Sequence, residues 1–326
     1  MDIEAVTGMQ TYSIRQEYGS EVHDGLSKLF DVSAYLNFPF TLDEATKYFL
    51  PKSNLSSEEL RYLLTRQDYA DLKFTVKDDY LLTTDDQSLR SRFEREQVSA
   101  AKLESAASFA KLLTRLVPFI RTIAVTGSVA YGSADKWDDV DLFVITERNR
   151  LWLSTFLMLL QIRLYKLLEL RAAHLLPFCL SYLHDEEGFS NESQRSRTNP
   201  LFARELLKAK PVAGTEEYRR ILEENRWVAD YYTTPYEETL RLLKPDIHGK
   251  TKRAPVPTGL QSFLLVWAEG MSYAILSRYL RLRAYLTNLK LRSEGKSLRA
   301  FEPKISPASC VYTSNFYRWL SALWGS

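Results

Sequence analysis

The sequence predicts an α+β protein in which a small sheet lies between helical regions. Two short apolar runs, Ile123–Val125 and Leu142–Ile145, have the length and composition of buried strands. Apolar residues recur at helical spacing on either side of them, first in Val22–Phe38 and later in Gln261–Leu291. Helices and strands grouped in this way, without regular alternation, are typical of the α+β class.

The N-terminal part, residues 1–95, is predicted to be a separate module that begins with three helices. Val22–Phe38 is the first of them. Each of the next two begins at a capping box, in which a Ser or Thr cap is followed three residues later by Glu. The two boxes are Thr41 with Glu44 and Ser56 with Glu59.

A predicted β-hairpin follows the third helix. Its strands are Leu72–Val76 and Tyr80–Thr83, and a charged turn joins them. Three helices followed by a hairpin are the order of a winged helix, which binds DNA through its third helix. Basic residues do not dominate that helix, since Arg61 and Arg66 stand against Glu58, Glu59 and Asp68. Nucleic-acid binding and a docking or substrate-positioning role therefore both remain open.

The chemistry predicted for the chain is concentrated in Ile123–Thr146. Gly127 and Ser128 follow the first strand, and Asp139 and Asp141 lead into the second. Alternation along a strand puts both aspartates on one side, where each raises the other's pKa unless a cation lies between them. Mg²⁺ binds carboxylate oxygens and leaves positions open for phosphates. The backbone at Gly127 can approach such phosphates because glycine has no Cβ.

These residues resemble the signature of the nucleotidyltransferase superfamily of DNA polymerase β. Gly127-Ser128 and Asp139-Val140-Asp141 match its two motifs, and Gly127–Gly132 matches the fuller form Gly-Ser-x-Ala-x-Gly. The resemblance implies Mg²⁺- or Mn²⁺-dependent transfer of a nucleoside monophosphate from an NTP such as ATP, with release of pyrophosphate. It implies that Gly127 and Ser128 bind the nucleotide, and that Asp139 and Asp141 are catalytic metal ligands.

Over roughly residues 30–230 the chain also resembles bacterial and archaeal proteins in which a winged-helix module precedes a nucleotidyltransferase domain. Their Arg-Leu-Trp turn is matched by Arg150-Leu151-Trp152. We therefore expect three parts: a winged-helix-like module at 1–95, a nucleotidyltransferase domain at 96–210 and, from the helical pattern that follows, a helical C-terminal region at 211–326. The acceptor stays open between RNA, DNA, a protein hydroxyl and a small molecule.

The chain departs from the superfamily pattern at the third carboxylate, which usually lies on a strand beside the Asp pair. The candidate strand Pro177–Leu183 contains no acid, and Cys179 or Ser181 occupies the equivalent place. Other candidates follow the strand directly: His184, Asp185 and Glu186. The departure leaves a second hypothesis open, in which the fold is weakly active or inactive and acts as a nucleic-acid-binding or antitoxin-like module.

Two helical segments are predicted to pack on the sheet. Asp86–Val117 links it to the N-terminal module and ends at Pro118. Leu151–Leu170 is predicted to cover the sheet, with Arg163 and Lys166 on its polar side. Its expected buried side chains are Leu153, Phe156, Leu157, Leu160, Leu164 and Leu167.

The C-terminal region combines a basic segment with an apolar tail. From Arg278 to Lys304 there are eight basic residues and two Glu. This excess fits contact with RNA, a nucleotide or a membrane surface, and it also fits a solvated helix end. The aromatic tail Asn315–Trp324 is predicted to pack on the protein or on a second subunit, since it would otherwise be an exposed patch.

Composition indicates a soluble cytoplasmic protein. The chain has 326 residues and a formal net charge of +2, so its overall charge gives no argument for nucleic acid. Two cysteines, Cys179 and Cys310, form no disulfide framework, which favours a reducing compartment. The N-terminus lacks a signal pattern, and the apolar runs are too short for a membrane span.

Overall fold

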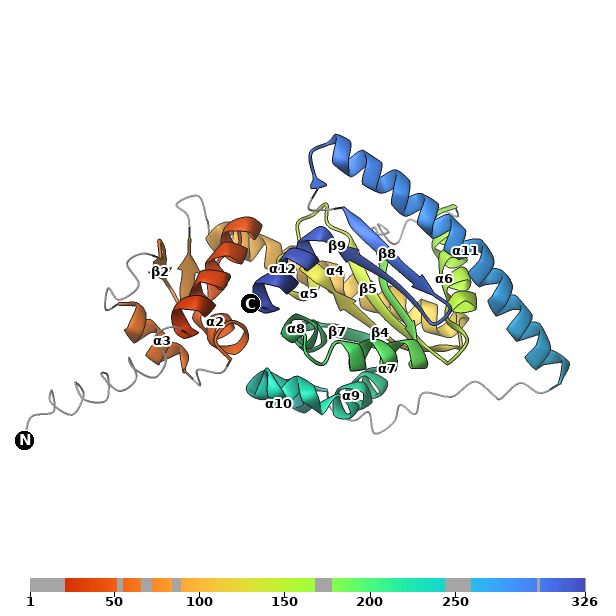
Figure 1. Cartoon of the computed structure of the whole chain (residues 1–326), viewed down its shortest axis with the longest axis horizontal. Helices are drawn as coiled ribbons and strands as arrows, with labels where there is room; N and C mark the ends of the chain where they lie inside the picture. The colour runs from red at the N-terminus through yellow and green to blue at the C-terminus, as the bar shows by residue number, and fades with distance from the viewer. Residues whose placement is uncertain are drawn as a thin grey trace, which may run out of the picture. The chain divides into compact units, whose positions relative to one another are not determined.

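The chain forms two compact units, one made of residues 1–94 with 229–237 and the other of residues 95–228 with 238–326. The computed structural model, drawn in Figure 1, describes residues 21–51, 55–65, 72–83, 89–167, 178–243, 259–297 and 300–325. The predicted domain boundaries after residues 95 and 210 stay predictions.

The first unit contains the predicted helices and hairpin. Residues 21–36 are helical. After them come β1 (Phe40–Thr41), α2 (Leu42–Tyr48), α3 (Ser57–Leu64), β2 (Thr75–Lys77) and β3 (Tyr80–Leu82). The strands pair antiparallel in the order β1-β3-β2. Both capping boxes are present, and in each the hydroxyl accepts from the Glu backbone N–H while the Glu carboxylate accepts from the cap backbone N–H.

The second unit is built on one sheet with helices on both sides, so the α+β class is confirmed. Its elements begin with α4 (Leu89–Leu116), which links the two units along the chain. They continue with β4 (Ile120–Thr126), α5 (Gly127–Ala130), β5 (Val140–Thr146), α6 (Leu151–Leu167), β6 (Phe178–Asp185), α7 (Glu186–Arg195), α8 (Pro200–Lys208), β7 (Lys210–Ala213), α9 (Thr215–Glu224), α11 (Leu260–Ser293), β8 (Phe301–Ser306), β9 (Ser309–Ser314) and α12 (Asn315–Gly325). The 3₁₀ turn Arg226–Asp230 and α10 (Thr233–Leu242) are divided between the units, because residues 229–237 belong to the first.

The sheet has six strands in the order β7-β4-β5-β6-β9-β8. β5 and β6 are parallel, and the other neighbouring pairs are antiparallel. One face carries the main apolar core, where α4, α6 and part of α11 pack on buried strand residues such as Val140 and Leu142. Phe143 lies on the opposite face and packs against Phe189 of α7 and Tyr218 of α9.

The prediction of which side of α6 is buried was wrong. Phe156, Leu160 and Leu164 are exposed, whereas the buried side includes Trp152 and Thr155. The helix is apolar nearly all round, so the spacing of its apolar residues does not select one face. Thr155 can be buried because its Oγ1 donates to the Leu151 carbonyl oxygen at 2.7 Å.

The C-terminal region contains the predicted long helix and also strands that we did not expect. α11 matches the predicted helix closely, and α12 packs on α8 and β9, as expected for the apolar tail. The hairpin of β8 and β9 joins the sheet beside β6. Most of the predicted linker at 243–258 and the end of the predicted helix at 151–170 lie outside the described residues. Within the described ranges, no helix combines the length and apolarity needed to cross a bilayer.

Candidate functional site

The site is built where β4 ends and β5 begins. The two strands are antiparallel neighbours, and Thr126 pairs with Asp141. Val140 and Leu142 are 0% and 1% exposed and point into the core, so the pleat turns Asp141 to the other face. Asp139 lies just before β5 and is exposed. The predicted alternation of apolar and acidic side chains is therefore present.

Gly127 lies directly against the carboxylate of Asp141. Its φ of +65° is one that residues with a side chain rarely adopt. A Cβ on Gly127 would collide with Oδ2 of Asp141 and would lie 3.2 Å from its Cγ. Both the backbone conformation and the space therefore require glycine here. The fold joins the Gly-Ser motif and the second aspartate into one site.

A tight turn follows the glycine. Residues Gly127–Ala130 form the single turn α5, and Gly132, with φ of +75°, ends it. The backbone N–H of Ser133 donates to the Ser128 carbonyl oxygen at 2.9 Å. These bonds fix the backbone around Ser128, whose side chain is half-buried at the end of β4.

A buried lysine of α4 fixes the loop that leads to the aspartates. Lys102 is 4% exposed, and its Nζ donates to the carbonyl oxygens of Asp135 at 2.6 Å and Asp138 at 2.5 Å. Ser99, one turn earlier, accepts from the Ala134 backbone N–H at 3.1 Å. Lys102 was missed in the sequence because only the packing of α4 brings it to a loop more than thirty residues further along the chain.

The two aspartates lie where a negative charge is costly. The pKa of Asp141 is raised to about 6, mainly by burial and also by the charge of Asp139, against a hydrogen bond from Ser181 that lowers it. Asp139 is accessible to solvent, but partial burial of its carboxyl group and the charge of Asp138 still raise its pKa. Lys102 and Arg283 of α11 act in the opposite direction on Asp139. A pair of carboxylates with raised pKa values suits a divalent cation, which favours their charged forms.

The neighbouring strand supplies no third carboxylate. In the pairing of β5 with β6, Cys179 lies opposite Asp141, and the register shifts between Leu142 and Phe143. The hydroxyl of Ser181 donates a hydrogen bond to Asp141 Oδ1. Burial and the Asp141 charge raise the pKa of Cys179 to about 11, so this thiol stays protonated at neutral pH. Among the described residues, no group of three or more His, Cys, Asp or Glu side chains could hold a metal.

The other predicted candidates lie at the far end of β6. Asp185 caps α7 and accepts backbone hydrogen bonds from Gly188 at 2.8 Å and from Asn149 at 2.9 Å. Glu186 forms an ion pair with Arg121 at 3.3 Å. His184 is fully buried and pairs with Ile145, four residues along β5 from Asp141. The fold therefore does not bring these three residues to the aspartates.

An exposed tryptophan in the loop before the aspartates also went unnoticed in the sequence. Trp137 is 81% exposed, and Lys136 Nζ lies 5.1 Å from the centroid of its ring. The loop holding this pair is the one that Lys102 fixes. A large exposed aromatic residue two positions before Asp139 is unusual for a surface loop.

Residues 107–212 match the family model described as a nucleotidyltransferase domain. This part of the chain is a nucleotidyltransferase domain. The match runs from α4 to β7 and covers the Gly-Ser motif and both aspartates. It agrees with the resemblance to the polymerase β superfamily and supports nucleotidyl transfer as the general chemistry.

The comparison defines the domain without identifying a particular relative. No curated protein and no solved structure matches the chain. The matched residues are about a third of the 326-residue chain, so the first unit and the α11, β8, β9 and α12 region lie outside the nucleotidyltransferase domain. What the domain acts on has to be inferred from its own residues.

Proposed function

We propose that this nucleotidyltransferase domain transfers a nucleoside monophosphate from an NTP to an acceptor hydroxyl, with Asp139 and Asp141 binding Mg²⁺ or Mn²⁺. The observation that carries the proposal is the contact between Gly127 and the Asp141 carboxylate, because it joins the nucleotide motif to the metal ligands. The acceptor oxygen would form a bond to the α-phosphorus, and pyrophosphate would leave with the electrons of the broken P–O bond.

The residues of the chain have separate parts in this proposal. Gly127 lets the Asp141 carboxylate lie directly against the backbone of the turn, and the backbone N–H groups there and Ser128 would bind the triphosphate oxygens. Lys102 holds the preceding loop so that Asp139 stays next to Asp141. A divalent cation bound by the two carboxylates would neutralise charge on the phosphates during transfer.

The described site contains no general base beside the aspartates that could remove the proton of the acceptor hydroxyl. Ser181 occupies the place of the third carboxylate, and its hydroxyl already donates to Asp141. A protonated thiol at Cys179 is no base near neutral pH. The acceptor hydroxyl would therefore lose its proton to water or to a base on the acceptor, which predicts slow transfer.

The lack of a third carboxylate beside Asp141 in the described site also favours a second candidate function. In it, the nucleotidyltransferase fold is inactive and acts as a binding or antitoxin-like module. The first unit is relevant to both candidates, because its helix–β1–α2–α3–hairpin order supports a winged-helix-like module. Arg61 of α3 pairs with Asp79 of the hairpin turn. This cation is occupied within the unit, which favours docking over DNA binding.

The test is transfer from each labelled NTP with Mg²⁺ or Mn²⁺, using the parent, Asp139→Asn and Asp141→Asn. Each substitution should lower transfer by at least on the order of a hundredfold, because an anionic metal ligand is lost. Asp135→Asn is the matched control, since this acid lies in the same loop and its side chain is 60% exposed. It should keep the parent rate.

Melting in EDTA distinguishes the two candidate functions further. The folded-state pKa of Asp141 is raised from 3.8 to about 6. The folded state therefore favours protonated Asp141, and this contribution to the free energy of unfolding is fully present below pH 3.8. It is lost as the pH rises through 6, so that near neutral pH the charged carboxylate lowers the free energy of unfolding by about 3 kcal/mol. Asp141→Asn without metal should melt higher than the parent at pH 7.5. An inert parent together with a destabilised Asn variant would contradict the proposed enzyme.

A further inference from the structure

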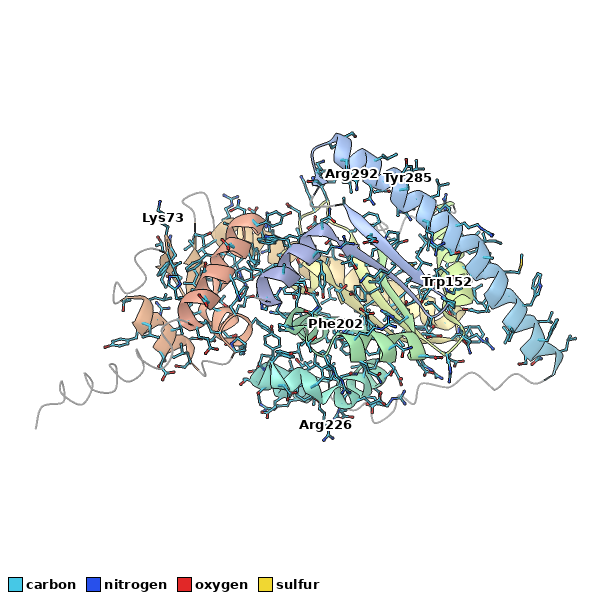
Figure 2. All side chains as sticks on the ribbon, in the orientation of Figure 1. Lys73, Trp152, Phe202, Arg226, Tyr285 and Arg292 are labelled. Atoms are coloured by element: carbon cyan, nitrogen blue, oxygen red, sulfur yellow. The ribbon has the colours of Figure 1, made fainter. Side chains whose placement is uncertain are left out.

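Helix α11 presents an apolar surface on the side that faces away from the sheet. Large apolar side chains that are 42–72% exposed occur along its length, from Leu260 to Leu289. Figure 2 shows Tyr285 on this outer side. The opposite side of the helix is buried through Leu276, Leu280 and Ala284. Apolar residues thus cover both sides of a helix that has only one side in the core.

Helix α6 extends this surface. Phe156, Leu160 and Leu164 are 42–46% exposed. α6 packs beside α11, where the rings of Trp152 and Tyr273 lie 5.2 Å apart. We call the exposed side chains of these two helices, Leu151–Leu167 and Leu260–Ser293, the α6–α11 face. Monomeric soluble proteins rarely expose a continuous apolar surface of this extent without a function.

The charge on the α6–α11 face has one sign. Glu269 is the only acidic residue in either helix, and it turns inward to accept hydrogen bonds from two backbone N–H groups of α6. The exposed charged side chains of the face are Arg163, Arg278, Arg281, Arg283, Lys290 and Arg292. The chain as a whole is nearly balanced, with 43 basic and 41 acidic residues. The face is therefore selectively basic.

Four basic residues of α11 flank the apolar stripe, two on each side, whereas Arg278 lies within the stripe. Successive residues of a helix are rotated by about 100°, so Leu264, Met271, Leu282 and Leu289 point in the same direction to within about 20°. Arg281 and Arg292 lie about 90° to one side of this direction. Arg283 and Lys290 lie about 90° to the other, where Arg283 also acts on Asp139 and Lys290 forms an ion pair with Glu294 at 3.9 Å. Long basic side chains placed in this way can reach up to headgroups while the stripe is inserted.

We propose that the α6–α11 face binds the surface of an anionic lipid bilayer, with α11 lying in the plane of the interface. An anionic bilayer matches both features of the face. The apolar stripe can insert among the acyl chains, and the flanking cations can bind the anionic headgroups. Trp267 and Tyr285 suit the boundary between the two. A second copy of the chain would bring the same cations without acids to pair them, so it is the less favourable occupant.

The test is co-sedimentation of the full chain with phosphatidylcholine vesicles that contain or lack phosphatidylserine. The protein should bind only the anionic vesicles, and added salt should weaken binding. Arg281→Gln with Arg292→Gln should weaken it on the order of thirtyfold, at about fivefold per charge. Leu264→Gln with Trp267→Gln should abolish it. Leu242→Gln is the matched control, because Leu242 is 81% exposed outside the face.

Two outcomes would overturn the proposal. The first is failure to bind anionic vesicles at low salt, or equal binding to neutral ones. The second is a dimer in sedimentation equilibrium that Leu264→Gln with Trp267→Gln dissociates, which would assign the face to a second copy. Trp267 is 60% exposed, so circular dichroism should show that its variants fold. The test does not depend on nucleotidyl transfer, because vesicle binding is measured without NTP.

Discussion

His184 shows what one buried polar side chain costs this fold. It is fully buried among the rings of Phe143, Tyr182 and Phe189, and neither ring nitrogen has a hydrogen-bond partner in the described part of the chain. Burial lowers its pKa from 6.5 to about 3, so it stays neutral where a free histidine would gain a proton. A residue that was a candidate base therefore has no access to the aspartates and little basicity.

Replacing His184 with Leu should stabilise the protein. Two unsatisfied ring nitrogens are removed at similar volume, which should raise the free energy of unfolding by about 1–3 kcal/mol at pH 7.5 in urea denaturation. The gain should grow as the pH falls below 6.5, since the unfolded histidine then binds a proton that the folded one excludes until about pH 3. A variant less stable than the parent at pH 7.5 and also below pH 6.5 would show that the nitrogens have a partner.

Some site residues were predictable from the sequence and others were not. Gly127 and Asp141 carry local signals, because glycine at a strand end and an acid within an apolar strand are visible in one short stretch. Ser181 and Lys102 reach the site only through β-pairing and helix packing across the chain. Such contacts leave no periodic pattern in the sequence.

At the scale of elements, the predictions succeeded where local rules decide. Both capping boxes form because their hydrogen bonds lie within four residues. The face of α6 was predicted wrongly, since tertiary packing against α11 and the strands β5 and β6 decides it. The β8–β9 hairpin was missed because the alternation in residues 301–314 is weak and proline stands within it at Pro303. Pairing with β6 stabilises these strands in the fold.

Glu269 shows how one helix fixes the end of another. From α11, its two carboxylate oxygens accept from the backbone N–H groups of Trp152 at 2.7 Å and Leu153 at 2.8 Å. These groups have no partner within α6, because they belong to its first turn. An N-cap that is usually local is here supplied from a distant part of the chain.

Glu269→Ala should lower the free energy of unfolding by about 1–2 kcal/mol, because it leaves two N–H groups of α6 without an acceptor. Glu269→Gln keeps one oxygen acceptor and should lose less. Urea denaturation of the two variants and the parent measures this order. Equal stability of all three would mean that water replaces the carboxylate at no cost.

At the scale of the whole molecule, a nucleotidyltransferase domain accounts for about a third of the chain. The remainder adds a small helix-and-hairpin unit and a long helix that carries the α6–α11 face. Arg283 belongs to that helix and lowers the pKa of Asp139. The region outside the matched domain therefore contributes to the electrostatics of the candidate site.

Calorimetric titration of ATP and the other NTPs, with Mg²⁺ or with EDTA, tests the central claim that Gly127, Asp139 and Asp141 form a metal-dependent nucleotide site. The parent should bind at least one NTP with Mg²⁺ and lose affinity by at least on the order of a hundredfold in EDTA. Asp141→Asn with Mg²⁺ should resemble the parent in EDTA, and Asp135→Asn should resemble the parent with Mg²⁺. Equal NTP affinity of the parent with Mg²⁺ and in EDTA would contradict the account.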